Sequence, residues 1–380
     1  MAVQKWDDKM LESMRSETDP VADAVVAEII DVDGLETVVN NIKQLVNNRE
    51  IVPADMHPRV QRYFQETASL PDWADPQLIE KGEQVFELNG PEMIASLFFL
   101  ALPFAYASRK GAHVLMLTAR ISQHTERRIF RTAQFIMDVM SDGGLGPEGR
   151  GIRSTQKIRL IHAAMRHYLL HRPQWREHWD MEWGMPLNQE DLAGTLMDFS
   201  SGVMRGLESI GIRLRPDEAE AYMHCWKVVG HILGVVPALI PHDVADGTAL
   251  AETIKRRQWA PSEAGVELTA SLVNYMQTFL PGTFLDGLIP TAMRHFLKHE
   301  QQAIEYLKVP PADWTRVLLR VQLLLIRATE RWRHRTPGIS HLVRVFFRRM
   351  VDGLLLVEMG GRRWTMDIPP GLRKTWRMKN

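Results

Sequence analysis

One predicted helix, KIRLIHAAMRHYLLH at residues 157–171, carries three histidines among apolar side chains. His162 is the histidine that is embedded in small and apolar residues. This setting favours a neutral imidazole that can coordinate iron through one ring nitrogen. A lone histidine on an apolar helix face is more often a core residue whose ring is hydrogen-bonded. The segment therefore allows two interpretations of His162, an iron ligand and a packed core residue.

The other two histidines of this segment, His167 and His171, are four residues apart and share a helix face. Such a pair can bind zinc, but a zinc site needs a third ligand, and the HEXXH motif is absent from the chain. His171 also lies near the predicted helix end, where the helix dipole stabilises a cation. We interpret both histidines as structural.

A second predicted helix, TERRIFRTAQFIMDVM at residues 125–140, places polar side chains beside an apolar stripe. Arg128, Arg131, Thr132 and Phe135 follow the spacing i, i+3, i+4 and i+7, so they share one face. Two cations, a hydroxyl and an aromatic ring on one face indicate groups that point into a cavity. The pattern alone favours the alternative, a partly exposed face whose arginines extend to water.

Helical periodicity extends over nearly the whole chain, and it sets these two segments in an all-α fold. Apolar residues recur at spacings of three and four rather than in alternation. Asn188 and Asp75 are predicted N-caps, and the glycine-rich stretch at 142–147 separates two helices. We expect one globular helical domain over residues 1–380 with peripheral terminal segments. The predicted helices span residues 20–39, 75–85, 91–107, 112–121, 125–140, 156–171, 189–211, 216–233, 248–258 and 265–279.

Charge and cysteine content exclude several classes of protein. The chain has 46 Lys and Arg against 46 Asp and Glu, so no basic excess indicates a nucleic-acid partner. Residues 1–40 are rich in acids and residues 331–380 in bases, and we expect these ends to lie near each other or to face water. The single cysteine, Cys225, excludes an intramolecular disulfide, CxxC redox chemistry and a CxxCH haem attachment.

No segment is predicted to direct the chain out of the cytoplasm. The N-terminal stretch is acidic and lacks the apolar core of a signal peptide. The longest apolar run, Met93–Ala107, is shorter than the ~20 residues that a membrane-spanning helix needs. We interpret this run as a buried helix and expect a cytoplasmic protein.

Several stretches in consistent order resemble the family of mpaB-type and latex-clearing-protein (rubber oxygenase) domains. The similar stretches are ASLFFLALPFAYASRKGAHVLMLTAR, RRIFRTAQFIMDVM, KIRLIHAAMRHYL, PLNQEDLAGTLMDFSSGVMRGLESIGI and EAEAYMHCWKVVGHILGVVPALIPHD. They cover residues of about 20–260, which leaves a C-terminal helical extension at about 261–380. The resemblance implies a globin-reminiscent helical core that holds a non-covalent haem b.

The resemblance also assigns residues to the haem pocket. The proximal ligand of latex-clearing proteins is the histidine of the RLxHAxxR helix, which is His162 here. Their distal arginine and threonine match Arg128 and Thr132. Arg131 stands where they have a lysine, and arginine cannot ligate iron as a neutral amine can. The stretch 110–123 also lacks the acid that is proposed as the catalytic base in that family.

The implied function is a haem b-dependent oxygenase that cleaves a C=C bond of an apolar alkene or isoprenoid with O₂ to give carbonyl products. Arg128 and Arg131 would neutralise haem propionates or stabilise negative charge on dioxygen, and Thr132 would donate a hydrogen bond there. Phe135 and the apolar run 97–104 would line a substrate channel.

Two further residues are candidates for the haem pocket. Arg166, one turn after His162, would bond either a propionate or a buried acid. His231, on the apolar helix at residues 216–233, is a second candidate haem-pocket histidine. Its alternative is a core histidine bonded to a carbonyl.

Other classes of function compete with the oxygenase. A non-catalytic haem sensor or carrier would keep His162 but would not need Arg128 and Thr132 for turnover. A helical binding protein without haem is a further alternative. A peripheral membrane protein could use the segment His341–Met359, where arginines lie beside apolar residues. We favour the docking of that segment on the core as a terminal helix over contact with a membrane.

Overall fold

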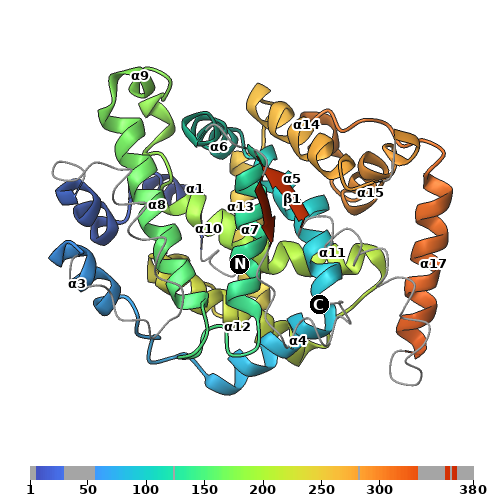
Figure 1. The fold of residues 1–380 in the computed structure, drawn as a ribbon, viewed down its shortest axis with the longest axis horizontal. Coiled ribbons are helices and arrows are strands. Elements are labelled where there is room, and N and C mark those ends of the chain that lie inside the picture. The colour runs from blue at the N-terminus through green and yellow to red at the C-terminus, as the bar shows by residue number, and fades with distance from the viewer. Residues whose placement is uncertain are drawn as a thin grey trace. The chain divides into compact units, whose positions relative to one another are not determined.

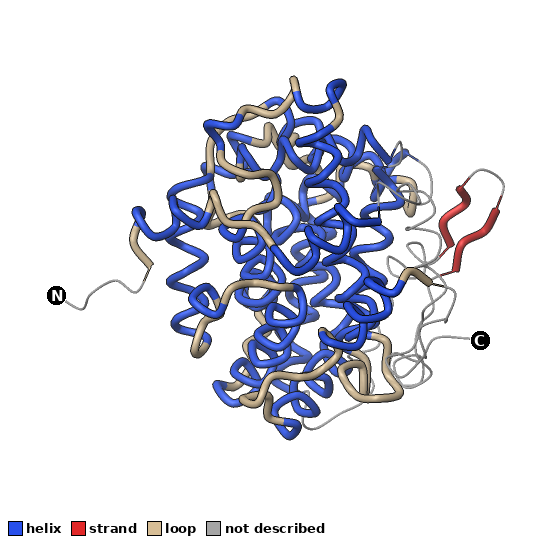
Figure 2. The backbone as a smooth tube through the Cα atoms, turned by 90° about the vertical axis from the view of Figure 1, so that its left-hand side faces the viewer, coloured by secondary structure: helices blue, strands red, loops and turns tan. Residues whose placement is uncertain are grey.

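The computed structural model describes residues 6–29, 56–122, 125–280, 283–332, 356–359 and 362–365. These residues are helical nearly throughout, as Figure 2 shows, which confirms the all-α fold. They also form one small antiparallel sheet, in which β1 (Leu356–Met359) pairs with β2 (Arg362–Thr365). The helix predicted over 341–359 is therefore wrong at its end, and residues 341–355 lie outside the described residues. The sequence between the strands is Gly360-Gly361, a pair that favours a two-residue hairpin turn.

The chain divides into two compact units, and each unit is built from three segments of sequence. The first comprises Met1–Gln84, Phe135–Met197 and Glu220–Arg257, and the second comprises Val85–Gln134, Asp198–Ala219 and Gln258–Asn380. Four helices have residues in both units, namely α4 (Pro76–Ser96), α7 (Thr125–Met140), α12 (Pro216–Leu233) and α13 (Val244–Gln258).

The first unit packs short N-terminal helices on the long helix α8 (Gly151–His171). Its apolar core joins the helix at residues 20–29 and α3 (Pro58–Glu66) to Leu160, Ala163 and Ala164 of α8. The other helices of the unit, labelled in part in Figure 1, are α1 (Asp8–Met14), α9 (Pro173–Arg176), η2 (Met181–Trp183), α10 (Gln189–Met197), α12 (Pro216–Leu233), η4 (Pro237–Leu239) and α13 (Val244–Gln258).

The second unit contains two π-helical segments, η1 (Leu97–Ala101) and η3 (Asp198–Gly202), which contact each other. A glycine permits a close approach beside them, because a Cβ on Gly206 would lie 2.4 Å from Ser96 Cβ. The remaining helices of the unit are α5 (Leu102–Ala107), α6 (Arg109–Ser122), α11 (Val203–Ile210), α14 (Glu263–Gln277), η5 (Thr283–Leu285), α15 (Leu288–Phe296), α16 (Gln301–Tyr306) and α17 (Arg316–Trp332).

Local sequence signals explain several helix ends. Asn188 caps α10, because its side chain accepts a hydrogen bond from the Asp191 amide at 3.0 Å. Asp75 caps α4 in the same way through the Gln77 amide at 2.8 Å. The prediction of separate helices at 75–85 and 91–107 is wrong, since α4 continues without interruption through Pro91. The residues that follow it, such as Met93 and Ile94, are fully buried, and this burial outweighs the local cost of a proline.

The apolar stretch that contains Met93–Ala107 is a core helix. By length and composition, Pro76–Ala107 is the one described helical stretch that could cross a membrane. However, 89% of its most apolar 18-residue part is buried inside the protein. Its aromatic rings are packed, with Phe99 5.4 Å from Phe296 and Phe104 4.9 Å from Trp259 between ring centroids. The substrate channel suggested for residues 97–104 stays a prediction.

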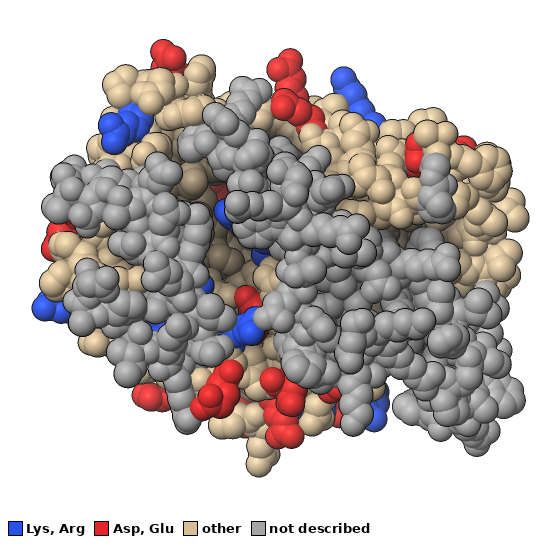
Figure 3. Space-filling view, viewed as in Figure 1, with Lys and Arg blue, Asp and Glu red and all other residues tan. Residues whose placement is uncertain are grey.

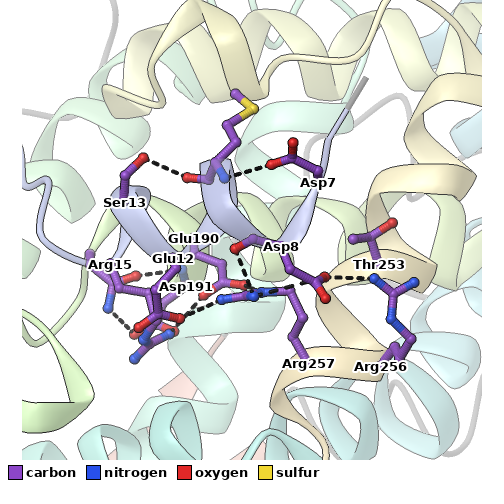
Figure 4. Close-up of polar contacts among 12 residues, drawn as sticks. Asp7, Asp8, Glu12, Ser13, Arg15, Glu190, Asp191, Thr253, Arg256 and Arg257 are labelled. Atoms are coloured by element: carbon purple, nitrogen blue, oxygen red, sulfur yellow. Dashed lines mark hydrogen bonds and ion pairs between the residues drawn. The ribbon is translucent and has the colours of Figure 1, made fainter. Parts of the chain in front are cut away.

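Acids of the N-terminal segment pair with arginines inside the first unit, and Asp8 and Glu12 remain 63% and 60% exposed, in line with the expectation that this segment faces water. Figure 4 shows acids of α1 meeting arginines of α13. Arg257 reaches Glu12 at 2.6 Å, and Arg256 reaches Asp8 at 2.6 Å. The fully buried Arg15 bonds Glu190 and Asp191 of α10. On the face drawn in Figure 3, the described acidic and basic side chains are interspersed.

Candidate functional site

His162 lies in the middle of α8, and its imidazole is held in the neutral form. Burial, followed by the charge of Arg166, lowers the pKa of His162 to about 4, although Asp19 opposes the shift. The ring nevertheless keeps some accessible surface.

One ring nitrogen of His162 is available for a bond. Its Nδ1 atom is buried and has no hydrogen-bond partner in the protein. A buried polar atom without a partner costs free energy, and such an atom in a native fold calls for an explanation such as an absent ligand. The packed-core interpretation predicted a hydrogen-bonded ring, which Nδ1 does not provide.

His162 points away from the apolar core of its unit. The core-facing residues of α8 are Leu160, Ala163 and Ala164. At 100° per residue, His162 lies on the opposite side of the helix, on the same stripe as Thr155 and Leu169. Both of these neighbours are completely buried, so this face of α8 is also enclosed by protein.

Arg159, one turn before His162, is paired with a buried acid. Its Nε and Nη2 atoms donate to the two carboxylate oxygens of Asp19 at 2.5 Å and 2.8 Å, and Nη1 donates to the Ile232 carbonyl at 3.1 Å. Gly234 leaves room for this pair. It has a φ of +87°, and a Cβ there would lie 2.7 Å from Asp19 Oδ2 and from Arg159 Nε.

Arg166, one turn after His162, is paired in the same manner. Its Nε donates to Asp23 Oδ1 at 2.9 Å and its Nη2 donates to the same oxygen at 2.8 Å, while Nη1 donates to the Leu187 carbonyl at 2.6 Å. Of the two partners that the sequence left open for Arg166, the structure therefore contains the acid. The two arginines bracket His162 and anchor its helix at both sides.

The residues predicted on α7 are divided between the two units. Thr132 is partly buried and Arg131 is exposed, and both belong to the second unit. The side chain of Arg128 lies outside the described residues. Phe135 belongs to the first unit with His162. It is buried there, with its ring centroid 6.2 Å from that of Trp226.

His231 lies on the surface rather than in the core. Its ring is exposed and packs edge-on to the exposed Trp73, at 6.1 Å between centroids. Nearby protein and the charge of Arg159 lower the pKa of His231. It lines an open pocket of about 430 Å³ together with Asp19 and Arg159. Neither the haem-pocket interpretation nor the carbonyl-bonded core interpretation anticipated this surface position.

Two buried acids were not singled out by the sequence. Burial raises the pKa of Asp198, at the start of η3, well above its usual range, while Arg205 offsets part of the shift. Burial also raises the pKa of Glu83 to about 7, although Glu83 accepts hydrogen bonds from the Gly143 and Leu145 amides. Glu83 thus ties the loop between α7 and α8 to α4.

The donor set fits a haem iron better than a bare metal ion. Among the described residues, no group of three or more His, Cys, Asp or Glu side chains is placed to hold a metal. A haem iron needs only axial ligands from the protein, because the porphyrin supplies the in-plane nitrogens. A single neutral histidine with an unpartnered ring nitrogen meets this requirement.

Comparisons with known proteins agree on one family. The family described as ER-bound oxygenase mpaB/B′/Rubber oxygenase, catalytic domain, matches residues 93–351. The chain is 29% identical over 233 residues to a rubber oxygenase of Streptomyces sp. (strain K30), which covers 59% of this chain and 54% of that protein. It thus spans about half the length of this relative. A solved latex-clearing protein in the closed state has the same fold, with a TM-score of 0.77, 24% identity, and coverage of 94% of this chain and 95% of the other.

Proposed function

Because the chain belongs to the family of mpaB and rubber oxygenase catalytic domains, we propose that it is a haem b-dependent oxygenase acting on an apolar alkene or isoprenoid. The reaction we propose is cleavage of a C=C bond with O₂ to give carbonyl products. The observation that carries the proposal is His162, a neutral histidine whose buried Nδ1 has no partner.

Each residue of the proposed site has a role that follows from its surroundings. When bound, haem supplies the redox chemistry by which O₂ is activated. His162 would ligate the iron, and its low pKa keeps the ring unprotonated at neutral pH. The ion pairs Arg159–Asp19 and Arg166–Asp23 hold the helix that carries it. Phe135 contributes a buried apolar ring to the same unit.

Polar groups on α7 would act on the oxygen side of the reaction. The Thr132 hydroxyl would donate a hydrogen bond, and Arg128 and Arg131 would stabilise negative charge. Arginine at position 131 stays protonated, so it would not ligate the iron as a neutral amine would. The acid expected at 110–123 is absent from this chain.

The experiment is an absorption spectrum of the protein expressed with a haem precursor. The parent is compared with His162→Ala and with His171→Ala, which removes an exposed histidine at the end of the same helix. We expect a Soret band in the parent and in His171→Ala, and its loss or shift in His162→Ala. A parent without a Soret band even after haem titration would contradict the proposal.

Turnover separates the oxygenase from a haem carrier. Holoprotein and Thr132→Val are incubated with long-chain alkenes and O₂, and carbonyl products are measured. We expect Thr132→Val to keep the Soret band and to lose roughly 10²-fold in rate, as removal of one stabilising donor does elsewhere. Haem binding without any carbonyl product from a panel of isoprenoids would favour the carrier instead.

A further inference from the structure

Exposed apolar side chains gather in one part of the second unit. Ten large apolar residues are strongly exposed among the described residues, and six of them lie between residues 284 and 324. They are Phe284, Trp314, Val317, Leu318, Val321 and Leu324. Single exposed apolar residues need no explanation, but a cluster of them marks an interaction surface.

The helix α17 carries most of this cluster on a face of its own. Its inner face, formed by Leu319, Leu323 and Ile326, is buried. At 100° per residue, Val317, Val321 and Leu324 lie on the opposite face, where they are between 52% and 64% exposed. A surface helix of a soluble domain normally has polar residues on its outer face. The apolar stripe on α17 therefore lacks a partner among the described residues.

An aromatic pair extends the apolar face beyond the start of α17. The rings of Phe284 and Trp314 lie 4.6 Å apart between centroids and are 74% and 45% exposed. Exposed Trp and Phe beside aliphatic residues are typical of elements that enter the boundary between lipid headgroups and acyl chains.

Cations flank the apolar face on one side. α17 lies alongside α15, as Figure 1 shows, and the two helices line a pocket of about 520 Å³. Among the described residues that line this pocket, none is an Asp or Glu. Five of them are basic side chains, namely Arg294, His295, Lys298, Arg316 and Arg320. On the helical wheel, Arg316 and Arg320 lie between the buried face of α17 and its exposed apolar face.

The positive charge of this pocket is not neutralised by the contacts that its arginines make. Arg294 donates to the carbonyls of Val309 and Pro310 at 2.7 Å and 2.6 Å. Arg316 Nε donates to the backbone carbonyl of Asp313 at 3.2 Å. The Asp313 carboxylate accepts from the Thr315 hydroxyl and amide. Neutral carbonyls satisfy the donors but leave the charge available for an anion.

We propose that the surface formed by α15, α17, Phe284 and Trp314 binds a membrane that contains anionic phospholipids. The apolar face of α17 would enter the headgroup region, and Arg316 and Arg320 would extend to lipid phosphates, as in an interfacial amphipathic helix. Charge argues against a second copy of the chain as the occupant. A symmetric contact through α17 would bring the same cations of both copies together.

The test is flotation of the full-length protein with vesicles of phosphatidylcholine alone and of phosphatidylcholine with phosphatidylserine. We expect flotation with the anionic vesicles only, and a decrease as salt is raised. Arg316→Gln with Arg320→Gln should weaken binding more than tenfold, because each arginine near an anionic surface contributes about fivefold. The double variant Val321→Glu, Leu324→Glu should abolish it.

Two matched variants control for charge and for exposed apolar area. Arg215→Gln removes an exposed arginine of the same unit, and Leu88→Glu changes an exposed leucine on α4. Both should float like the parent, and all variants should keep the parent's thermal midpoint. Equal flotation on phosphatidylcholine alone, or no flotation, would overturn the proposal. So would sedimentation that shows a dimer broken by Val321→Glu, Leu324→Glu.

Discussion

The helices α8 and α17 both carry arginines beside apolar residues, yet the protein uses these arginines differently. In α8, Arg159 and Arg166 are buried, and each meets a carboxylate from the N-terminal segment. In α17, Arg316 and Arg320 are exposed, and no described acid pairs with either of them. The paired arginines build the scaffold of His162, whereas the unpaired ones leave charge available to a partner.

The different contacts of the two helices show that helical periodicity does not specify the partner of a charged residue. Both helices are amphipathic and basic in sequence, and the partners of α8 come from residues more than 100 positions away, with Asp19 140 positions from Arg159. Substitution of Asp19, Asp23 or Arg320 tests this difference one charge at a time, and the titration of His162 tests the burial of the helix face between the two pairs.

The largest effect is expected for Asp19→Ala. Removing this acid leaves the buried Arg159 guanidinium without its counter-charge, and breaking a buried pair in this way typically costs about 3–5 kcal/mol. Chemical denaturation of the haem-free protein measures the change. The control is Asp8→Ala, an exposed acid of the same segment that should cost at most about 1 kcal/mol. Equal losses in the two variants would mean that the burial of the Arg159 pair is unimportant.

The next effect is a dependence of stability on pH. Because the folded pKa of His162 is about 4, below its usual 6.5, the unfolded chain binds a proton between these values and the folded chain does not. Stability is therefore lost as pH falls from 6.5 to 4. In the haem-free protein, the parent should lose up to about 3 kcal/mol relative to His162→Gln over this range. Parallel curves for the two proteins would show that the His162 ring is not desolvated.

A smaller loss is expected for Asp23→Ala. The Asp23 side chain is 30% exposed, so water compensates part of the charge that Arg166 would lose. The Leu187 carbonyl also remains as a partner of Arg166. We expect a decrease of about 1–3 kcal/mol in the free energy of unfolding. A loss larger than that of Asp19→Ala would contradict this expectation, because the Arg166–Asp23 pair would then stabilise the fold more than the Arg159–Asp19 pair.

The smallest effect is expected for Arg320→Gln. An exposed side chain without an ionic partner contributes within about 0.5 kcal/mol to stability. Arg159→Gln on α8 provides the contrast, because it leaves Asp19 buried and unpaired. Thermal unfolding of both variants makes the comparison. A strong destabilisation by Arg320→Gln would indicate that α17 depends on this cation for its fold rather than for a partner.

Much of the helical framework follows from the sequence. Helices α7 and α12 begin and end where periodicity predicts, and the caps Asn188 and Asp75 act as expected. Periodicity does not reveal the π-helical segments η1 and η3, because each is only five residues long, about one turn. The run predicted as one helix over 189–211 therefore contains η3 in its middle.

The candidate site is predicted only in part. The apolar neighbours of His162 identify it as a neutral histidine, and the structure adds the unpartnered Nδ1. Long-range partners are invisible to local pattern, so the assignment of Arg166 to Asp23 and the surface position of His231 needed the tertiary structure. Asp198 has no sequence signal at all, because its burial alone distinguishes it from any other helical acid.

The measurement that tests the central claim most directly is chemical rescue of His162→Gly. This variant is expressed with a haem precursor, and its absorption spectrum is recorded with and without added imidazole. If His162 is the iron ligand, the parent-like Soret band is lost without imidazole and restored when free imidazole occupies the space of the missing ring. A parent-like spectrum in His162→Gly without imidazole would contradict the account, because another residue would then hold the iron.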